Sequence, residues 1–293
     1  MMQFLASFVW DPDRIFVRVP YLNFPIYWYG VLFGIGFAIE YLFLKKFVAP
    51  YLKRSTFTFE QNQQHLEKFM THCVTILTLC SVLGGRLGYV LFYGWPYYRE
   101  HPQDIVKIWE GGLASHGASI GLLAGLCLLC LSYRRKEPSL TFLTLLDMLA
   151  IPVGFTGACI RLGNFFNQEI TGTPTSLPWG VEFLHPLDGW GGIVHPVQLY
   201  EACFYLLLGC GMLLLARRFK HHIGTGLFIS VLFMVMFTFR FFIEFLKVPQ
   251  GEVMAQDAFL RMGQVLSLPF ILVGVILFIR YCKKVKHGKF SAS

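Results

Sequence analysis

Residues 224–246, GTGLFISVLFMVMFTFRFFIEFL, decide the fold class because they are apolar over almost their whole length. A helix needs about 20 predominantly apolar residues to cross the hydrocarbon core of a bilayer. This segment has that length, and its charged residues, Arg240 and Glu244, both fall near its end. The stretch therefore predicts a membrane-spanning helix that carries a polar group close to one face of the membrane.

The rest of the chain extends this pattern. Of its 293 residues, 55% are hydrophobic and only 14% are charged, whereas soluble domains carry roughly 25% charged residues. Six further segments have the length and composition of spans, with residues 27–48, 69–93, 117–133, 140–160, 197–216 and 262–281. The sequence thus predicts an all-α integral membrane protein with seven transmembrane helices.

The distribution of Lys and Arg predicts the orientation. These residues gather in the loops after the first, third and fifth segments and in the C-terminal tail. Because cytoplasmic loops carry the excess of positive charge, the N-terminus should lie outside and the C-terminus in the cytoplasm. The predicted parts are an extracytoplasmic segment 1–26, spans 1–4 in 27–160, an extracytoplasmic cap 161–196 with a strand over 177–181, spans 5–7 in 197–281, and a basic tail 282–293.

Most of the remaining polar residues fall in the outer third of the predicted bilayer, and Glu40 and Asp147 are the exceptions. Charged groups inside a membrane normally face a protein interior or a watery cavity and indicate function. Simpler interpretations stay open: Arg240 and Glu244 could form a structural ion pair, His116 could cap a helix, and Arg86 could reach the interface. The set comprises Tyr29, Arg86, His116, Arg161, His195, Gln198, Glu201, Arg240 and Glu244.

Two arginines in one outer chamber suggest a phosphate ligand, since the planar guanidinium donates parallel hydrogen bonds to phosphate oxygens. At that depth the available phosphate is a phospholipid headgroup, so the residues predict an enzyme or a carrier that handles phospholipid. The net charge of +8 is spread in short clusters beside apolar segments and does not predict a nucleic-acid partner. Motifs of metalloproteases, serine hydrolases and nucleotide-binding proteins are missing, and no metal or cofactor is expected.

Several motifs resemble those of the prolipoprotein diacylglyceryl transferase family. The most specific is residues 157–172, GACIRLGNFFNQEITG. The others follow in the family's order along nearly the whole chain: WYG at 28–30, GGRLGY at 84–89, GG at 111–112 with HG at 116–117, HPVQLYE at 195–201, and FRFFIEF at 239–245.

The resemblance implies transfer of the diacylglyceryl group of phosphatidylglycerol to the lipobox cysteine of a preprolipoprotein signal peptide, at the bacterial cytoplasmic (inner) membrane. It implies catalytic roles for His116, which would activate the thiol, for Arg240 and for Tyr29. Phosphatidylglycerol would be bound by Arg161, Asn164, Asn167, Glu169, Gly172 and Arg86. His195, Gln198, Glu201 and Glu244 would position these groups.

Two departures from the family pattern concern the site. Ser115 and Ala118 flank the His116 motif where an aromatic residue and a glycine are usual, and Thr171 and Thr173 stand where an aromatic residue and an arginine are commoner. The alternative class is an outer-leaflet phospholipid flippase or transporter. Such carriers usually bind near the midplane between inverted repeats, which this sequence does not show. The protein is expected to act as a monomer.

Overall fold

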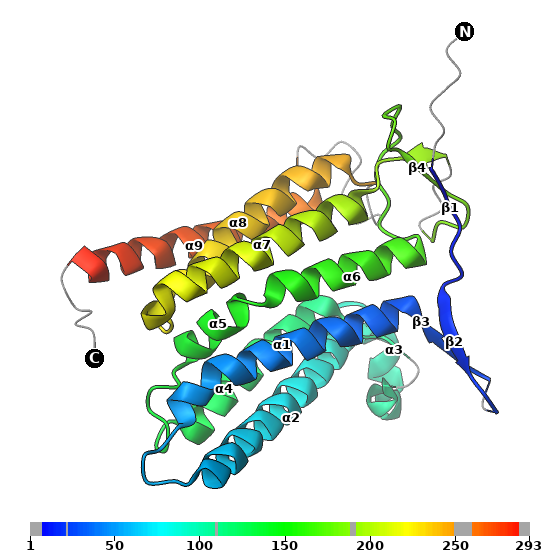
Figure 1. The fold of residues 1–293 in the computed structure, drawn as a ribbon. Coiled ribbons are helices and arrows are strands. Elements are labelled where there is room, and N and C mark those ends of the chain that lie inside the picture. The colour runs from blue at the N-terminus through cyan, green and yellow to red at the C-terminus, as the bar shows by residue number, and fades with distance from the viewer. Residues whose placement is uncertain (1–7, 22, 109–110, 188–191, 249–259, 287–293) are drawn as a thin grey trace. The chain divides into compact units, whose positions relative to one another are not determined.

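The computed structural model describes residues 8–21, 23–108, 111–187, 192–248 and 260–286 (Figure 1). The chain forms two compact units, one made of residues 1–44 with 146–293 and the other of residues 45–145. Most of the described elements are helices, and the five strands are short. Helix α1 (Trp28–Leu52) and helix α5 (Phe142–Ala150) contain the points at which the chain passes from one unit to the other.

Five of the described helices are long and apolar enough to cross a membrane: α2 (Phe59–Phe92), α4 (Ser115–Tyr133), α7 (Val197–Phe219), α8 (Leu227–Ile243) and α9 (Met262–Lys286). Helices α5 and α6 (Val153–Asn167) make a sixth if they are one span with a bend of 51°. Pro152, at the start of α6, explains the break because proline has no N–H for the helix ladder. The structure agrees with a multi-span helical membrane protein. Five or six of the seven predicted spans are thus found among the described helices, and a crossing by α1, which would be the seventh, stays a prediction.

In the second unit, α2 and α4 pack along a seam of glycines. A Cβ atom added to Gly84 would lie 2.4 Å from the carbonyl oxygen of Gly117, so only glycine permits this approach. Small residues of this kind let membrane helices come close enough for extensive van der Waals contact. Between the two helices the chain forms α3 (Trp95–Glu100) and the short 3-10 helix η1 (Pro102–Val106).

In the first unit, α6 packs on α7 and α8 packs on α9. Figure 1 shows α7, α8 and α9 running side by side. Asp147 belongs to α5, and its carboxylate reaches the start of α8. There it accepts hydrogen bonds from the N–H groups of Gly224 (2.9 Å), Gly226 (2.8 Å) and Ile229 (3.0 Å). These N–H groups have no partner within the helix, so Asp147 is a structural cap. Glu40, the other carboxylate away from the outer cluster, accepts a hydrogen bond from Thr156.

Short strands form two small sheets in the first unit. Strand β1 (Phe8–Trp10) pairs in parallel with β4 (Val181–Phe183), which pairs with β5 (Ile193–Val194). Strands β2 (Ile15–Val19) and β3 (Phe24–Tyr27) form a hairpin that leads directly into α1. The predicted N-terminal segment, through β1, and the predicted cap, through β4 and β5, therefore contribute strands to the same sheet. Phe165, Phe183 and Val194 are buried beneath it.

The predicted strand at 177–181 was wrong. The strand begins only at Val181, because Pro178 and Gly180 favour the turn that the Gly180 N–H closes on the Leu177 carbonyl. Helix α6 continues beyond residue 160, where the predicted fourth span ends, to Asn167, and Gln168 then takes the left-handed conformation with φ of 55°. Arg161 and Asn164 are consequently neighbours on one helical face rather than residues of an open cap.

Candidate active site

The last turn of α6 presents a linked set of polar side chains. Arg161 donates from Nη1 to the Oδ1 atom of Asn164 at 3.1 Å. The amide nitrogens of Asn164 and Asn167 donate to one oxygen, Oε1 of Glu169, at 2.8 and 3.2 Å. The left-handed Gln168 turns the chain so that Glu169 lies beside these helical residues. The structure therefore brings together Arg161, Asn164, Asn167 and Glu169 of the 161–169 motif.

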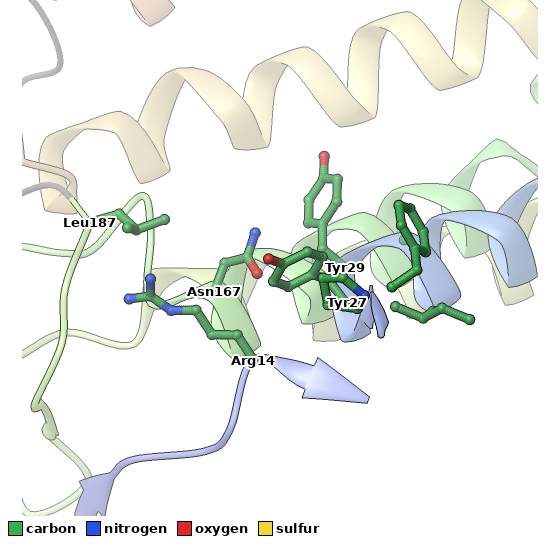
Figure 2. Close-up of a pocket in the computed structure, with 9 residues that line it drawn as sticks. Arg14, Tyr27, Tyr29, Asn167 and Leu187 are labelled. Atoms are coloured by element: carbon green, nitrogen blue, oxygen red, sulfur yellow. The ribbon is translucent and has the colours of Figure 1, made fainter. Parts of the chain in front are cut away.

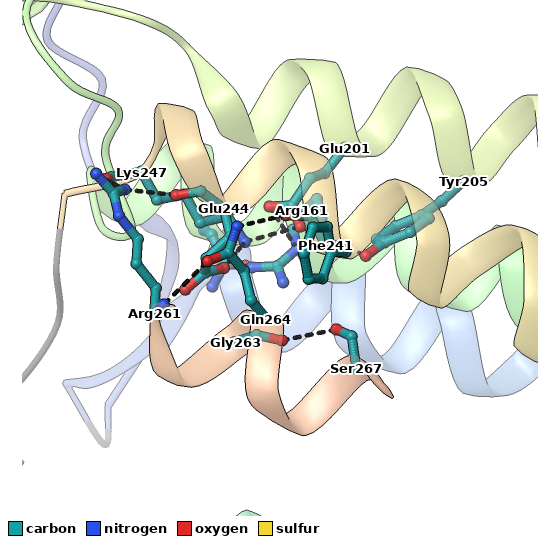
Figure 3. A network of polar contacts seen from close by, with 11 residues as sticks. Arg161, Glu201, Tyr205, Phe241, Glu244, Lys247, Arg261, Gly263, Gln264 and Ser267 are labelled. Carbon is teal, nitrogen blue, oxygen red and sulfur yellow. Dashed lines mark hydrogen bonds and ion pairs between the residues drawn. The ribbon is translucent and has the colours of Figure 1, made fainter. Parts of the chain in front are cut away.

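On its other side, Arg161 meets a buried carboxylate. Glu201 on α7 is fully buried, and its Oε2 lies 3.1 Å from Nε of Arg161 but accepts no hydrogen bond from the described residues. Its Oε1 accepts a hydrogen bond from Nζ of Lys247 at 2.9 Å (Figure 3). Glu201 is thus a single anion shared by two cations, which is how a buried charge is normally tolerated.

Lys247 is not among the site residues that the sequence indicated. Lys247 is 6% exposed and follows the 3-10 helix η4 (Glu244–Leu246) that extends α8. Besides its hydrogen bond to Glu201, its Nζ forms an ion pair with Oε2 of Glu244 at 3.7 Å. The available signal was the spacing of three residues from Glu244, which places two side chains on one helical face.

Arg240 does not form the structural ion pair with Glu244 that the spacing allowed. Within the described residues its half-buried guanidinium makes no hydrogen bond or ion pair. It does lie close enough to the Tyr205 hydroxyl to act on it electrostatically, as Arg161 also does. Glu244 is instead held through its carbonyl by Arg261, which donates from Nη1 at 2.5 Å.

The supporting residues at the start of α7 are tied to the same loop. Gln198 donates from Nε2 to the carbonyl of Glu169 at 2.8 Å, and its buried Oε1 makes no hydrogen bond within the part of the chain that the structure describes. The N–H of Gly172 donates to the carbonyl of His195 at 3.1 Å, and a Cβ on Gly172 would lie 2.3 Å from that oxygen. Only glycine fits here. The ring Nδ1 of His195 lies 3.4 Å from the hydroxyl of Tyr200.

Tyr29 stands beside α6 at the start of α1. A Cβ atom on Gly163 would lie 2.8 Å from its ring, and its hydroxyl is within electrostatic reach of Glu169 and Arg161. Tyr29 and Asn167 line a pocket of about 580 Å³ that is otherwise bounded by strand β3, Gly30, Arg14 and Leu187 (Figure 2). The pocket gives this cluster an opening of the size that small ligands use.

His116 and Arg86 belong to the second unit. His116 is the second residue of α4 and its side chain is exposed. Arg86 is 4% exposed, and its guanidinium donates to backbone carbonyls in the loop that precedes α4. The remaining predicted residues, from Tyr29 to Glu244, lie in the first unit.

Comparison with known proteins decides the family. A model of the prolipoprotein diacylglyceryl transferase family matches residues 15–280. The chain belongs to this family. A phosphatidylglycerol–prolipoprotein diacylglyceryl transferase of Chlamydia pneumoniae is 40% identical over 97% of this chain and 99% of its own length. Similar proteins of the same name from Tolumonas auensis (38% identical, 94% and 98% covered) and Porphyromonas gingivalis (35%, 98% and 99%) extend the likeness to other bacteria. The family resemblance expected from the motifs is confirmed over nearly the whole chain.

Proposed function

We propose that this transferase moves the diacylglyceryl group of phosphatidylglycerol to the lipobox cysteine of a prolipoprotein, the two substrates being those in the names of its relatives. The observation that carries the proposal is Arg240, a half-buried cation without a hydrogen bond or ion pair to the described chain. A buried charge without a partner is costly. An anionic phosphate bound near Arg240 and Arg161 would supply the missing partner.

In the reaction, the cysteine sulfur forms a bond to the terminal glycerol carbon of the diacylglyceryl group. The bond between that carbon and the phosphate oxygen breaks, and its electron pair leaves with glycerol-1-phosphate. The thiol loses its proton and the product is a thioether. Negative charge therefore builds on the departing phosphate, which is where cationic hydrogen-bond donors lower the barrier most.

Arg161 and Arg240 hold the phosphate in this mechanism. Arg161 already shares its charge with Glu201, but Lys247 also donates to that carboxylate at 2.9 Å. Lys247 can thus keep Glu201 paired while the guanidinium of Arg161 turns toward phosphate oxygens. Arg240 contributes a second planar donor, whose fork matches two phosphate oxygens better than a lysine would.

The headgroup glycerol is bound next to the phosphate. Asn164, Asn167 and Glu169 form a chain of amides and a carboxylate that can accept and donate to hydroxyl groups. Gly172 keeps the neighbouring backbone close to His195, and Gln198 fixes the Glu169 carbonyl. Glu244 positions Lys247 through an ion pair at 3.7 Å.

His116 takes the proton from the cysteine thiol, because the thiolate is the competent nucleophile and an imidazole exchanges protons near neutral pH. Tyr29, which lines the pocket with Asn167, assists by hydrogen bonding. Neither step requires a metal or a cofactor.

We place this chemistry at the outer face of the bacterial cytoplasmic membrane, with the N-terminus outside and the C-terminus in the cytoplasm. Helix α1 then adds a span to those formed by the other helices. The sheet of β1, β4 and β5 forms the extracytoplasmic cap, and a single copy of the chain suffices for the reaction.

A phospholipid carrier would use the same arginines, but the relatives named here are transferases.

Mass spectrometry of a lipobox peptide incubated with phosphatidylglycerol vesicles and the purified protein tests the proposal. We expect a diacylglyceryl mass gain with the wild type, none with His116→Gln, and full gain with the control His221→Gln, which changes an exposed histidine of η3 (Lys220–His222). No gain with well-folded wild-type protein would favour the carrier, and full gain with His116→Gln would remove its role as the base.

A further inference from the structure

Arg86 uses its guanidinium almost entirely on backbone carbonyls. Its Nε donates to Ile105 at 2.8 Å and its Nη2 to Asp104 at 2.6 Å. Its Nη1 donates to Gly111 at 2.7 Å and to Gly112 at 3.3 Å. A guanidinium has five N–H donors, so these four contacts leave it with little capacity for a substrate phosphate. The side chain is also 4% exposed.

The loop held by Arg86 is tied at further points. The carboxylate of Asp104 accepts hydrogen bonds from the Tyr97 hydroxyl and pairs with Nζ of Lys107, each at 2.6 Å. The ring of Tyr98 lies 5.1 Å from the Arg86 guanidinium carbon, in cation–π contact. Arg86 therefore holds both η1 and the residues that directly precede α4.

The two residues before Arg86, Gly84 and Gly85, contact the start of α4. The carbonyl of Gly85 accepts a hydrogen bond from the Ala114 N–H at 2.9 Å, and Gly84 touches the backbone of Gly117. Three consecutive residues of α2 thus fix the chain immediately before and after His116. Gly112 adds a constraint, since its φ is +75° and a Cβ there would lie 2.8 Å from Nη1 of Arg86.

From this arrangement we infer that Arg86 is a positioning residue for His116 and does not bind phosphatidylglycerol itself. It acts by holding residues 104–105 and 111–112, so that the first turn of α4 presents the imidazole at a fixed point. The inference rests on the proposed role of His116 as the base. Positioning matters because displacing a catalytic group by about 1 Å can lower the rate about 100-fold.

Steady-state kinetics of Arg86→Gln tests this role. We expect kcat to fall about 10- to 100-fold while the KM for phosphatidylglycerol stays within about twofold of wild type, since no phosphate ligand is lost. Arg99→Gln, which changes an exposed arginine of α3, is the matched control and should leave both constants unchanged. A raised KM with kcat retained would overturn the inference and make Arg86 a phosphate ligand.

Gly112→Ala tests the same loop without removing a charge, and it decides the matter if Arg86→Gln does not fold. The added methyl group must displace Arg86 or Tyr89, so kcat should again fall with KM preserved. An unchanged kcat in this variant would contradict the inference.

The pH profile separates positioning from a general loss of structure. Above the usual thiol pKa of about 8.5 the peptide is already a thiolate and needs no base. Arg86→Gln and His116→Gln should therefore recover toward wild type at high pH, whereas Arg161→Ala should not. Recovery of His116→Gln alone would refute the role of Arg86 but keep that of His116. Recovery of neither would refute the base role itself.

Discussion

The tripeptide Arg-Leu-Gly occurs twice, at 86–88 on α2 and at 161–163 on α6, and the two arginines have opposite surroundings. In both copies the glycine makes close contact with a neighbouring segment, Gly88 with Gly117 and Gly163 with Tyr29. Arg86 is surrounded by backbone carbonyls that cannot leave. Arg161 faces a carboxylate and an amide that have other partners. The first arginine is suited to fixing structure, and the second to exchanging its partner for a substrate.

The largest expected effect is that of Arg161→Ala. We expect transfer to fall by about 100- to 1,000-fold, the size of losing one donor to a developing oxyanion, with protein insertion retained because Lys247 still pairs Glu201. The rate is measured by mass spectrometry of the lipobox peptide, and folding by thermal denaturation in detergent. An equal loss of stability in Arg161→Ala and Arg86→Gln would remove the contrast between the two arginines.

Arg240 sharpens the contrast because, among the described residues, its guanidinium has no hydrogen bond or ion pair to exchange for a substrate. Arg240→Ala should nearly abolish transfer, and Arg240→Lys should restore only part of it, since an ammonium lacks the bidentate fork. Arg240→Ala should melt at or above the wild-type temperature, as it removes a half-buried charge without a hydrogen bond or ion pair to the described residues. Full activity with lysine would show that a point charge is enough.

Glu201→Gln removes the anion shared by Arg161 and Lys247. Leaving a buried charge without its partner costs about 3 to 5 kcal/mol, so this variant should unfold at lower denaturant concentration than the wild type. Adding Lys247→Met should restore part of the stability, because one of the two buried cations is then removed. Independent, additive losses in this double-mutant cycle would contradict a shared carboxylate.

The smallest effect concerns Asp104 in the loop held by Arg86. Hydrogen bonds from Lys107 and Tyr97 lower the pKa of this carboxyl below its ordinary value. A lowered folded-state pKa gives stability that is present above the unfolded pKa, about 3.9, and is lost as pH falls through the folded pKa. Asp104→Asn should therefore reduce stability at pH 7 and weaken its dependence on pH below 4. Denaturation curves at pH 7 and pH 3 measure both effects, and an unchanged pH dependence would contradict them.

Much of the site was predictable because the motif 157–172 is contiguous. Helical spacing alone brings Arg161 beside Asn164, and one turn further the chain reaches Asn167 and Glu169. The role of Lys247 could not be predicted from local spacing. Its significance depends on Glu201, which is distant in the sequence and meets it only when α7 and the end of α8 come together.

The sequence by itself determined the helical membrane character, the family and the polar residues of the site, because hydropathy and contiguous motifs are local properties of the chain. Only the tertiary structure decided the partners of each charge. Arg86 and Arg161 are both followed by Leu-Gly, but their side chains have different partners in the fold. Arg86 contacts backbone carbonyls of a loop, and Arg161 contacts Glu201. Electrostatic interactions depend on distance in space and burial, which spacing along the chain does not specify.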